Sequence, residues 1–113
     1  MNQPVASPLV TLADDGLRAK GPGSAPFDGE GVPTSRRVIV EKGVLRGFMY
    51  NTAVARRAGV KSTGNAARGG FTSVPDIGPH NFYMEAGSTS PAEIVKATAR
   101  GVWLKGVTGY GIN

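Results

Sequence analysis

The stretch that decides the fold reads Arg36-Arg-Val-Ile-Val-Glu-Lys-Gly-Val-Leu-Arg-Gly-Phe-Met-Tyr50. Its two halves are rich in β-branched and other apolar residues, and Lys42-Gly43 stands between them. A two-residue turn between strands requires positive φ, which glycine adopts without a steric penalty. The sequence therefore predicts a β-hairpin over about residues 36–50.

A short helix is predicted directly after the hairpin, over about residues 52–58. Asn51 or Thr52 can cap its free amide groups. Gly59 fits the position after the last turn, where a left-handed conformation commonly ends a helix.

A second helix is predicted over about residues 91–100. Ser90 and Glu93 form a capping-box pattern, and Pro91 stands at the first helical position. Gly101 is expected to end the helix. The side chains expected on its buried face are Ile94, Ala97 and Thr98.

The remaining pattern predicts an α+β fold with a mostly antiparallel sheet, the hairpin at its centre and the two helices packed on or beside it. Asp14-Asp15-Gly16 has the composition of a turn. Residues 16–35 contain many glycines and prolines and are expected to form one long loop. Further strands are predicted at residues 7–13, 81–85 and 102–105.

The composition limits the size and class of the protein. At 113 residues the chain is one domain or part of one. It contains no cysteine, which excludes disulfides, thiolate metal sites and a cysteine nucleophile in this chain. We find neither a charged leader followed by an apolar segment nor an apolar run near the ~20 residues that a membrane helix needs. We therefore expect a cytoplasmic protein that makes no membrane contact.

A net charge of +5 leaves a nucleic-acid role open, but the basic residues are scattered along the chain. The densest group comprises Arg56, Arg57, Lys61 and Arg68. One alternative is thus a small basic β-rich module that binds nucleic acid, which we do not favour. A second alternative is a structural dimer formed through open sheet edges.

The chain contains few of the metal-ligating and acid/base residues that a hydrolase needs. A zinc hydrolase uses at least three protein ligands, and His80 is the single histidine. Asp28 and Glu30 could form an acid/base pair only if they faced each other in a cleft, and a solvated turn explains them better. We therefore expect no catalytic and no metal-binding residue here. The residues kept as cavity or loop candidates are Asp28, Glu30, Thr63, Asn65, His80 and Asn81.

Several blocks of the chain, in order, resemble the carboxy-terminal domain of the TldD/PmbA family, zinc metallopeptidases once called modulators of DNA gyrase. The blocks are Val5-Ala-Ser-Pro-Leu, Pro26-Phe-Asp-Gly-Glu-Gly-Val-Pro33, the hairpin, Ser62-Thr-Gly-Asn65, Asn81-Phe-Tyr-Met-Glu85, the capped second helix and Gly109-Tyr-Gly-Ile-Asn113. The first and last of these blocks are most similar to the PmbA-like (TldE-like) branch. The resemblance covers nearly the whole chain, so residues 1–113 are expected to form a single partial domain, the middle part of such a carboxy-terminal domain.

The resemblance also implies where the family's chemistry lies. Its active members carry a His-Glu-x-x-x-His zinc motif in an amino-terminal domain, and none of the metal-binding positions matches a residue here. The chain is therefore expected to be inactive alone and to lack a cofactor, with zinc only in a complete TldD-type partner. The implied partners are a TldD-like or PmbA-like paralogue or a second copy, with peptides as substrates of the full assembly.

Overall fold

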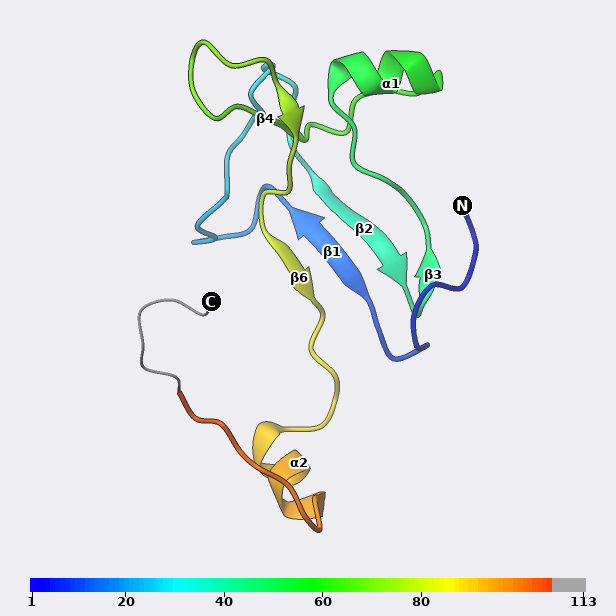
Figure 1. The fold of residues 1–113 in the computed structure, drawn as a ribbon, viewed down its shortest axis with the longest axis vertical. Helices are drawn as coiled ribbons and strands as arrows, with labels where there is room; N and C mark the ends of the chain where they lie inside the picture. Colours follow the sequence, from blue (N-terminus) through cyan, green and yellow to red (C-terminus); the bar gives the residue numbers. More distant parts are fainter. Residues whose placement is uncertain (107–113) are drawn as a thin grey trace, which may run out of the picture.

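The computed structural model describes residues 1–106, and its centre is a four-stranded antiparallel sheet with the order β3-β2-β1-β6 (Figure 1). The strands are β1 (Leu12–Asp15), β2 (Arg36–Glu41), β3 (Val44–Leu45) and β6 (Phe82–Met84). The predicted α+β class with a mostly antiparallel sheet is confirmed.

Strand β1 lies further along the chain than the sequence predicted. It runs through Asp14 and Asp15, which were expected to form a turn, and residues 7–11 precede it. Asp14 pairs with Arg37 of β2 and with Phe82 of β6. Backbone pairing on both sides outweighs the local turn preference of aspartate. The turn begins at Gly16, directly after β1, and the amide of Leu17 donates to Oδ1 of Asp15 at 2.9 Å.

The hairpin is confirmed, although its second strand is shorter than predicted. Glu41 pairs with Val44 across a two-residue turn in which Lys42 and Gly43 have φ of 47° and 80°. Two positive φ angles match the right-handed twist of the strands. Strand β2 lies inside the sheet, whereas β3 lies at its edge. The amino-terminal segment covers that edge, because Leu45 accepts from the amide of Asn2 at 2.8 Å.

Helix α1 (Thr52–Ala58) has the bounds that the sequence predicted. The side chain of Asn51 accepts from the amide of Val54, and Gly59 ends the helix in the left-handed conformation with φ of 67°. Beyond it, β4 (Ala66–Ala67) and β5 (Asp76–Ile77) form a separate two-stranded sheet that the sequence did not predict.

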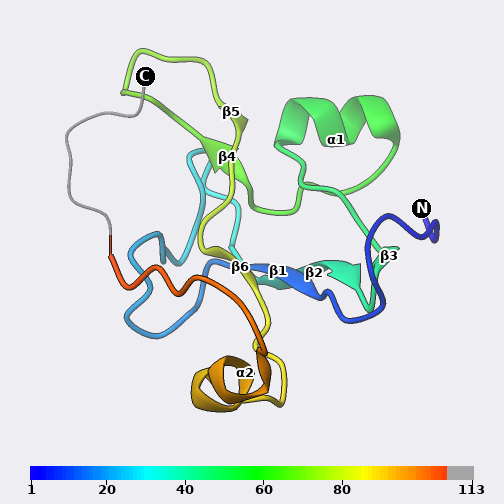
Figure 2. The ribbon, with the colours of Figure 1, turned by 60° about the horizontal axis from the view of Figure 1, so that its bottom comes forward.

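Helix α2 (Pro91–Ala97) begins with the predicted capping box but ends at Ala97, before the predicted boundary at residue 100. It has no buried residue, so the expectation that it packs on the sheet through Ile94, Ala97 and Thr98 is wrong. It stands away from the sheet (Figure 2). Residues 102–105 form no strand. The capping box explains why α2 forms although it is exposed, since it specifies a helix start without requiring tertiary contacts.

The buried interior is small and polar. Its apolar members are Ala13, Val40, Ala55 and Ala66. Its polar members are Asp14, Asp28, Thr34, Asn51, Thr63 and Asn65. Buried polar groups require hydrogen-bond partners, so the arrangement of these side chains determines how the loops fit together. Neither helix of the described part has the length and apolarity that crossing a bilayer demands.

Candidate functional site

Asp14 lies at the centre of a buried polar network. Only 2% of its surface is exposed. One carboxylate oxygen, Oδ1, accepts the backbone amide of His80 at 2.8 Å. The other, Oδ2, accepts the side-chain amide of Asn65 at 2.7 Å. The middle of β1 is thereby connected to two loops from the second half of the chain.

Asn65 and Thr63 extend the network towards the end of the hairpin. The amide nitrogen of Asn65 also donates to the carbonyl of Gly78 at 3.2 Å. Its oxygen lies 2.7 Å from the hydroxyl of Thr63, and that hydroxyl accepts from the backbone amide of Tyr50 at 2.8 Å. Every polar atom of the Asn65 side chain therefore has a protein partner.

Asp28 binds backbone amides only. Its Oδ1 accepts from Glu30 and Val32, each at 2.9 Å, and its Oδ2 accepts from Ala66 at 2.8 Å. These bonds close the turn in the 16–35 loop and attach it to β4. Glu30 points elsewhere, because its carboxylate accepts the amide of Thr52 at the start of α1 at 2.8 Å. Glu30 thus satisfies one of the free amides of the helix.

His80 and Asn81 attach further segments. Nε2 of His80 lies 2.7 Å from the carbonyl of Gly64, and since a carbonyl only accepts, Nε2 donates. The Asn81 side chain accepts from the amide of Gly23 at 2.9 Å and donates to the carbonyl of Asp15 at 2.6 Å. Both side chains therefore connect loops to one another.

The six residues selected from the sequence do not converge on one cleft. Thr63, Asn65 and His80 belong to the Asp14 network, and Asp28 reaches the amide next to Asn65. Glu30 binds the amide of Thr52 at the start of α1, and Asn81 binds the amide of Gly23 in the 16–35 loop. Within residues 1–106, no three histidine, cysteine or carboxylate side chains are grouped so that they could share a metal ion.

Sequence reasoning missed Asp14, the buried carboxylate that joins the side chain of Asn65 to the backbone amide of His80. Its neighbours Asp15 and Gly16 made it look like part of a turn. The available signal was that Asp14 directly follows the apolar residues Leu12 and Ala13, so that it could continue the strand that they begin. Asn51 and Thr34 were also missed as buried residues, although Asn51 was recognised as a helix cap.

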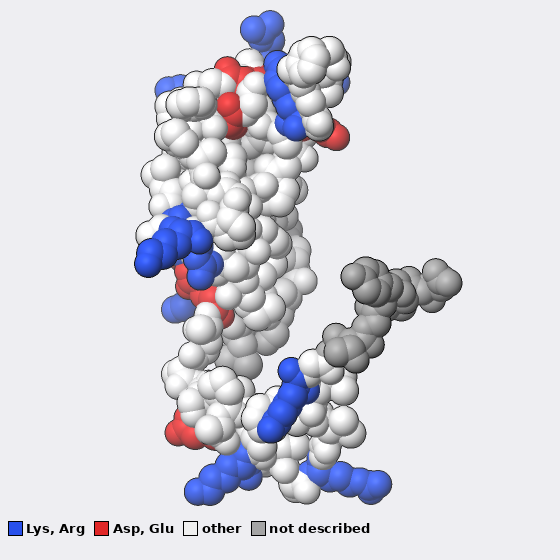
Figure 3. Space-filling view, turned by 90° about the vertical axis from the view of Figure 1, so that its left-hand side faces the viewer, with Lys and Arg blue, Asp and Glu red and all other residues white. Residues whose placement is uncertain are grey.

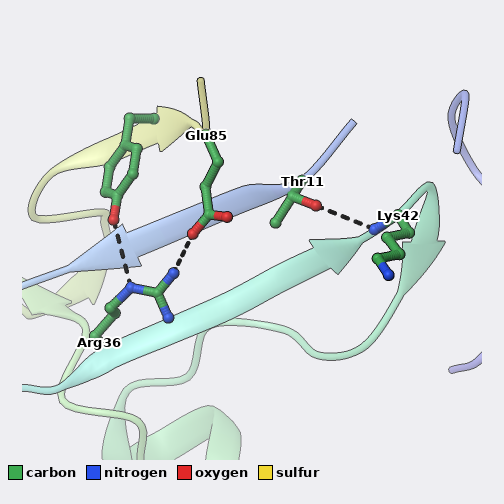
Figure 4. A network of polar contacts seen from close by, with 5 residues as sticks. Thr11, Arg36, Lys42 and Glu85 are labelled. Atoms are coloured by element: carbon green, nitrogen blue, oxygen red, sulfur yellow. Dashed lines mark hydrogen bonds and ion pairs between the residues drawn. The ribbon is translucent and has the colours of Figure 1, made fainter. Parts of the chain in front are cut away.

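An exposed ion pair crosses the central strand β1, from the start of β2 to the segment that follows β6 (Figure 4). The guanidinium of Arg36 on β2 pairs with Glu85, which follows β6, and Nε of Arg36 donates to the hydroxyl of Tyr83 at 3.4 Å. The contact with Tyr83, followed by the charge of Glu85, raises the pKa of Arg36 above its usual value. At the other end of β2, the amide of Lys42 donates to the hydroxyl of Thr11 at 3.2 Å.

Comparison with known proteins identifies the family. A model of the PmbA/TldA metallopeptidase C-terminal domain matches residues 1–113. The chain belongs to this family. A metalloprotease TldD homolog of Buchnera aphidicola is 35% identical over 105 residues, which are 93% of this chain and 22% of the relative. Metalloprotease PmbA of Escherichia coli O157:H7 is 33% identical over 104 residues, covering 92% of this chain and 21% of the relative.

Solved structures agree with this assignment. TldE of Thermococcus kodakarensis matches with a TM-score of 0.75 and 33% identity, over 86% of this chain and 22% of that chain. A Thermotoga maritima protein that bears the name modulator of a DNA gyrase matches with a TM-score of 0.75 and 38% identity, over 85% of this chain and 21% of that chain. This TldD/PmbA family chain thus spans about a fifth of the length of these relatives. Matches come from both branches, and the PmbA-like assignment stays a prediction.

Proposed function

We propose that this chain is a non-catalytic framework segment of a TldD/PmbA-type metallopeptidase that degrades or matures peptides. The observation that carries the proposal is the use of the buried polar groups. Both oxygens of Asp14 and both oxygens of Asp28 accept hydrogen bonds from N–H donors. Carboxylates used in this way connect segments of the fold and are not available for acid/base chemistry.

The donor set does not fit a zinc site in this chain. Zinc binding in a hydrolase requires three ligand atoms with open lone pairs. His80 could offer only Nδ1, because Nε2 donates to the carbonyl of Gly64. Within residues 1–106 no two further histidine, cysteine or carboxylate side chains are grouped with it, and the carboxylate of Asp14 already accepts from Asn65 and from the amide of His80. We place zinc instead in a complete TldD-type partner.

The proposed partners follow from the family. They are a TldD-like or PmbA-like paralogue, or a second copy of the chain, and peptides are the substrates of the full assembly in the cytoplasm. The nucleic-acid alternative gains no support from α1. Arg56 and Arg57 lie in its last turn, where positive charge stabilises the negative end of the helix dipole. These two residues therefore have a structural explanation.

The proposal is tested by incubating the purified chain with a mixture of unfolded peptides, with and without added zinc, and analysing the products by mass spectrometry. We expect the peptides to stay intact in both cases. Cleavage that co-elutes with the chain and stops on chelation would contradict the proposal. The His80→Gln variant separates the chain from a contaminating protease, because contaminant activity would persist in it.

A further inference from the structure

An open cavity of about 560 Å³ lies between residues 18–22 of the long loop and residues 80–83 at the start of β6. Two basic side chains, Arg18 and Lys20, line it from the loop side. The guanidinium carbon of Arg18 lies 4.2 Å from the centre of the Tyr83 ring. A cation–π contact of this kind fixes the plane of the guanidinium while leaving its N–H groups available.

No carboxylate lines the cavity, and the nearest acidic residues in the sequence have partners elsewhere. Oδ1 of Asp15 accepts the amide of Leu17, and Glu85 pairs with Arg36. Over residues 1–106 the ion pairs are Arg36–Glu85 and Arg46–Glu41. Within that part of the chain, Arg18 and Lys20 therefore have no carboxylate that neutralises them.

The loop that carries the two charges has a defined conformation. Lys20 has a φ of 59°, a left-handed conformation that persists in a non-glycine residue only where the surrounding structure enforces it. The carbonyl of Arg18 accepts from the hydroxyl of Ser24 at 2.6 Å, and Asn81 binds the amide of Gly23 at 2.9 Å. These bonds attach both ends of the loop, so the backbone that carries the two side chains is positioned before any ligand arrives, and Tyr83 positions the guanidinium of Arg18 as well.

From this geometry we infer that the cavity binds a small oxyanion group, a phosphate or a carboxylate, through Arg18 and Lys20. A planar guanidinium and an ammonium group together supply the charge-assisted donors that such groups accept. Figure 3 shows basic atoms at mid-height on one side of the molecule, with acidic atoms directly below them. This inference concerns binding alone and does not depend on the proposed role in a metallopeptidase.

The test is an NMR titration of the isotope-labelled chain with inorganic phosphate and, separately, with acetate, each compared with sodium chloride at matched ionic strength. We expect saturable shifts of the amide signals of residues 18–24 and 80–83, absent with chloride. Tighter binding of phosphate would point to a phosphorylated ligand, and tighter binding of acetate to a ligand with a carboxylate. Shifts that grow linearly for both anions, or that chloride reproduces, would overturn the inference.

Two variants and a matched control locate the site. Lys20→Gly removes the charge and accepts the positive φ, so it does not strain the loop. Arg18→Gln removes the other charge. Each is expected to weaken binding by at least about tenfold, the loss expected for one charge-assisted hydrogen bond. Lys96→Gln in α2 removes one charge away from the cavity and is expected to change nothing. Equal weakening by all three variants would overturn the inference.

Discussion

Asp14 and Asn65 are joined by a buried 2.7 Å hydrogen bond across 51 positions of the sequence. The bond connects the central strand β1 to the segment that leads into β4. The same carboxylate accepts the amide of His80, so three distant segments meet at one buried anion. A buried carboxylate is tolerated only where donors compensate its lost hydration.

Asn65→Ala should therefore destabilise the chain strongly. It leaves Oδ2 of Asp14 without its donor and the hydroxyl of Thr63 without one partner. We expect the free energy of unfolding to fall by about 3 kcal/mol. Urea denaturation measures it. The control is Thr72→Ala at an exposed position, expected to change stability by less than about 0.5 kcal/mol.

Asp28→Asn tests the turn in the 16–35 loop. Asparagine provides one acceptor oxygen where three backbone amides now bind two, and its amino group opposes a donor. We expect a loss of about 2 kcal/mol and faster hydrogen exchange at the amide of Ala66. Asp76→Asn, the same change at an exposed aspartate, should leave both quantities nearly unchanged. An equal effect of the two variants would refute the assigned role of Asp28.

Gly31 and Gly64 separate two costs of replacing glycine by alanine. Both have positive φ, 79° and 71°. A Cβ on Gly31 meets nothing within 4 Å, whereas on Gly64 it would lie 2.5 Å from the carbonyl oxygen of Pro33. We expect Gly31→Ala to cost about 1 kcal/mol from backbone strain alone. Gly64→Ala should cost at least about 1 kcal/mol more because of the clash. Thermal denaturation compares the two, and equal costs would show that the Pro33–Gly64 contact is loose.

Helix α2 should depend on pH through its capping box. Hydrogen bonds from the side chain and backbone of Ser90 lower the pKa of Glu93 below its usual value. A carboxylate with a lowered pKa in the folded state stabilises the helix above its unfolded-state pKa. That contribution is lost as the pH falls through the lowered, folded-state value.

NMR shifts of α2 during an acid titration measure this effect. In Ser90→Ala the titration of Glu93 should return towards its usual range, and helix stability should fall by about 1 kcal/mol at neutral pH. Because α2 has no buried residue, the NMR signals of the sheet in Ser90→Ala should match those of the wild-type chain at the same pH. A concerted change in the sheet would contradict the independence of α2.

The elements with strong local signals were predicted well. The Lys42-Gly43 turn, the Asn51 cap and the Ser90 capping box each specify structure through neighbours in sequence. The position of β1 was not predicted, because its strand conformation depends on pairing with β2 and β6.

The polar network was predicted only in part. Thr63, Asn65 and His80 were selected from the sequence, but their common partner Asp14 was not. Contacts over 51 and 66 positions leave no local signature. The burial of α2 was predicted wrongly, since an apolar stripe indicates which face could pack and does not supply the surface that it packs against.

The zinc content of the purified chain tests the central claim most directly. The chain is exposed to excess zinc, passed over a desalting column and analysed by inductively coupled plasma mass spectrometry, with zinc-loaded full-length TldD-type metalloprotease as the positive control. We predict a zinc-to-protein ratio no higher than that of the His80→Gln variant. One tightly held zinc per chain, lost in His80→Gln, would contradict the account of a framework without its own metal site.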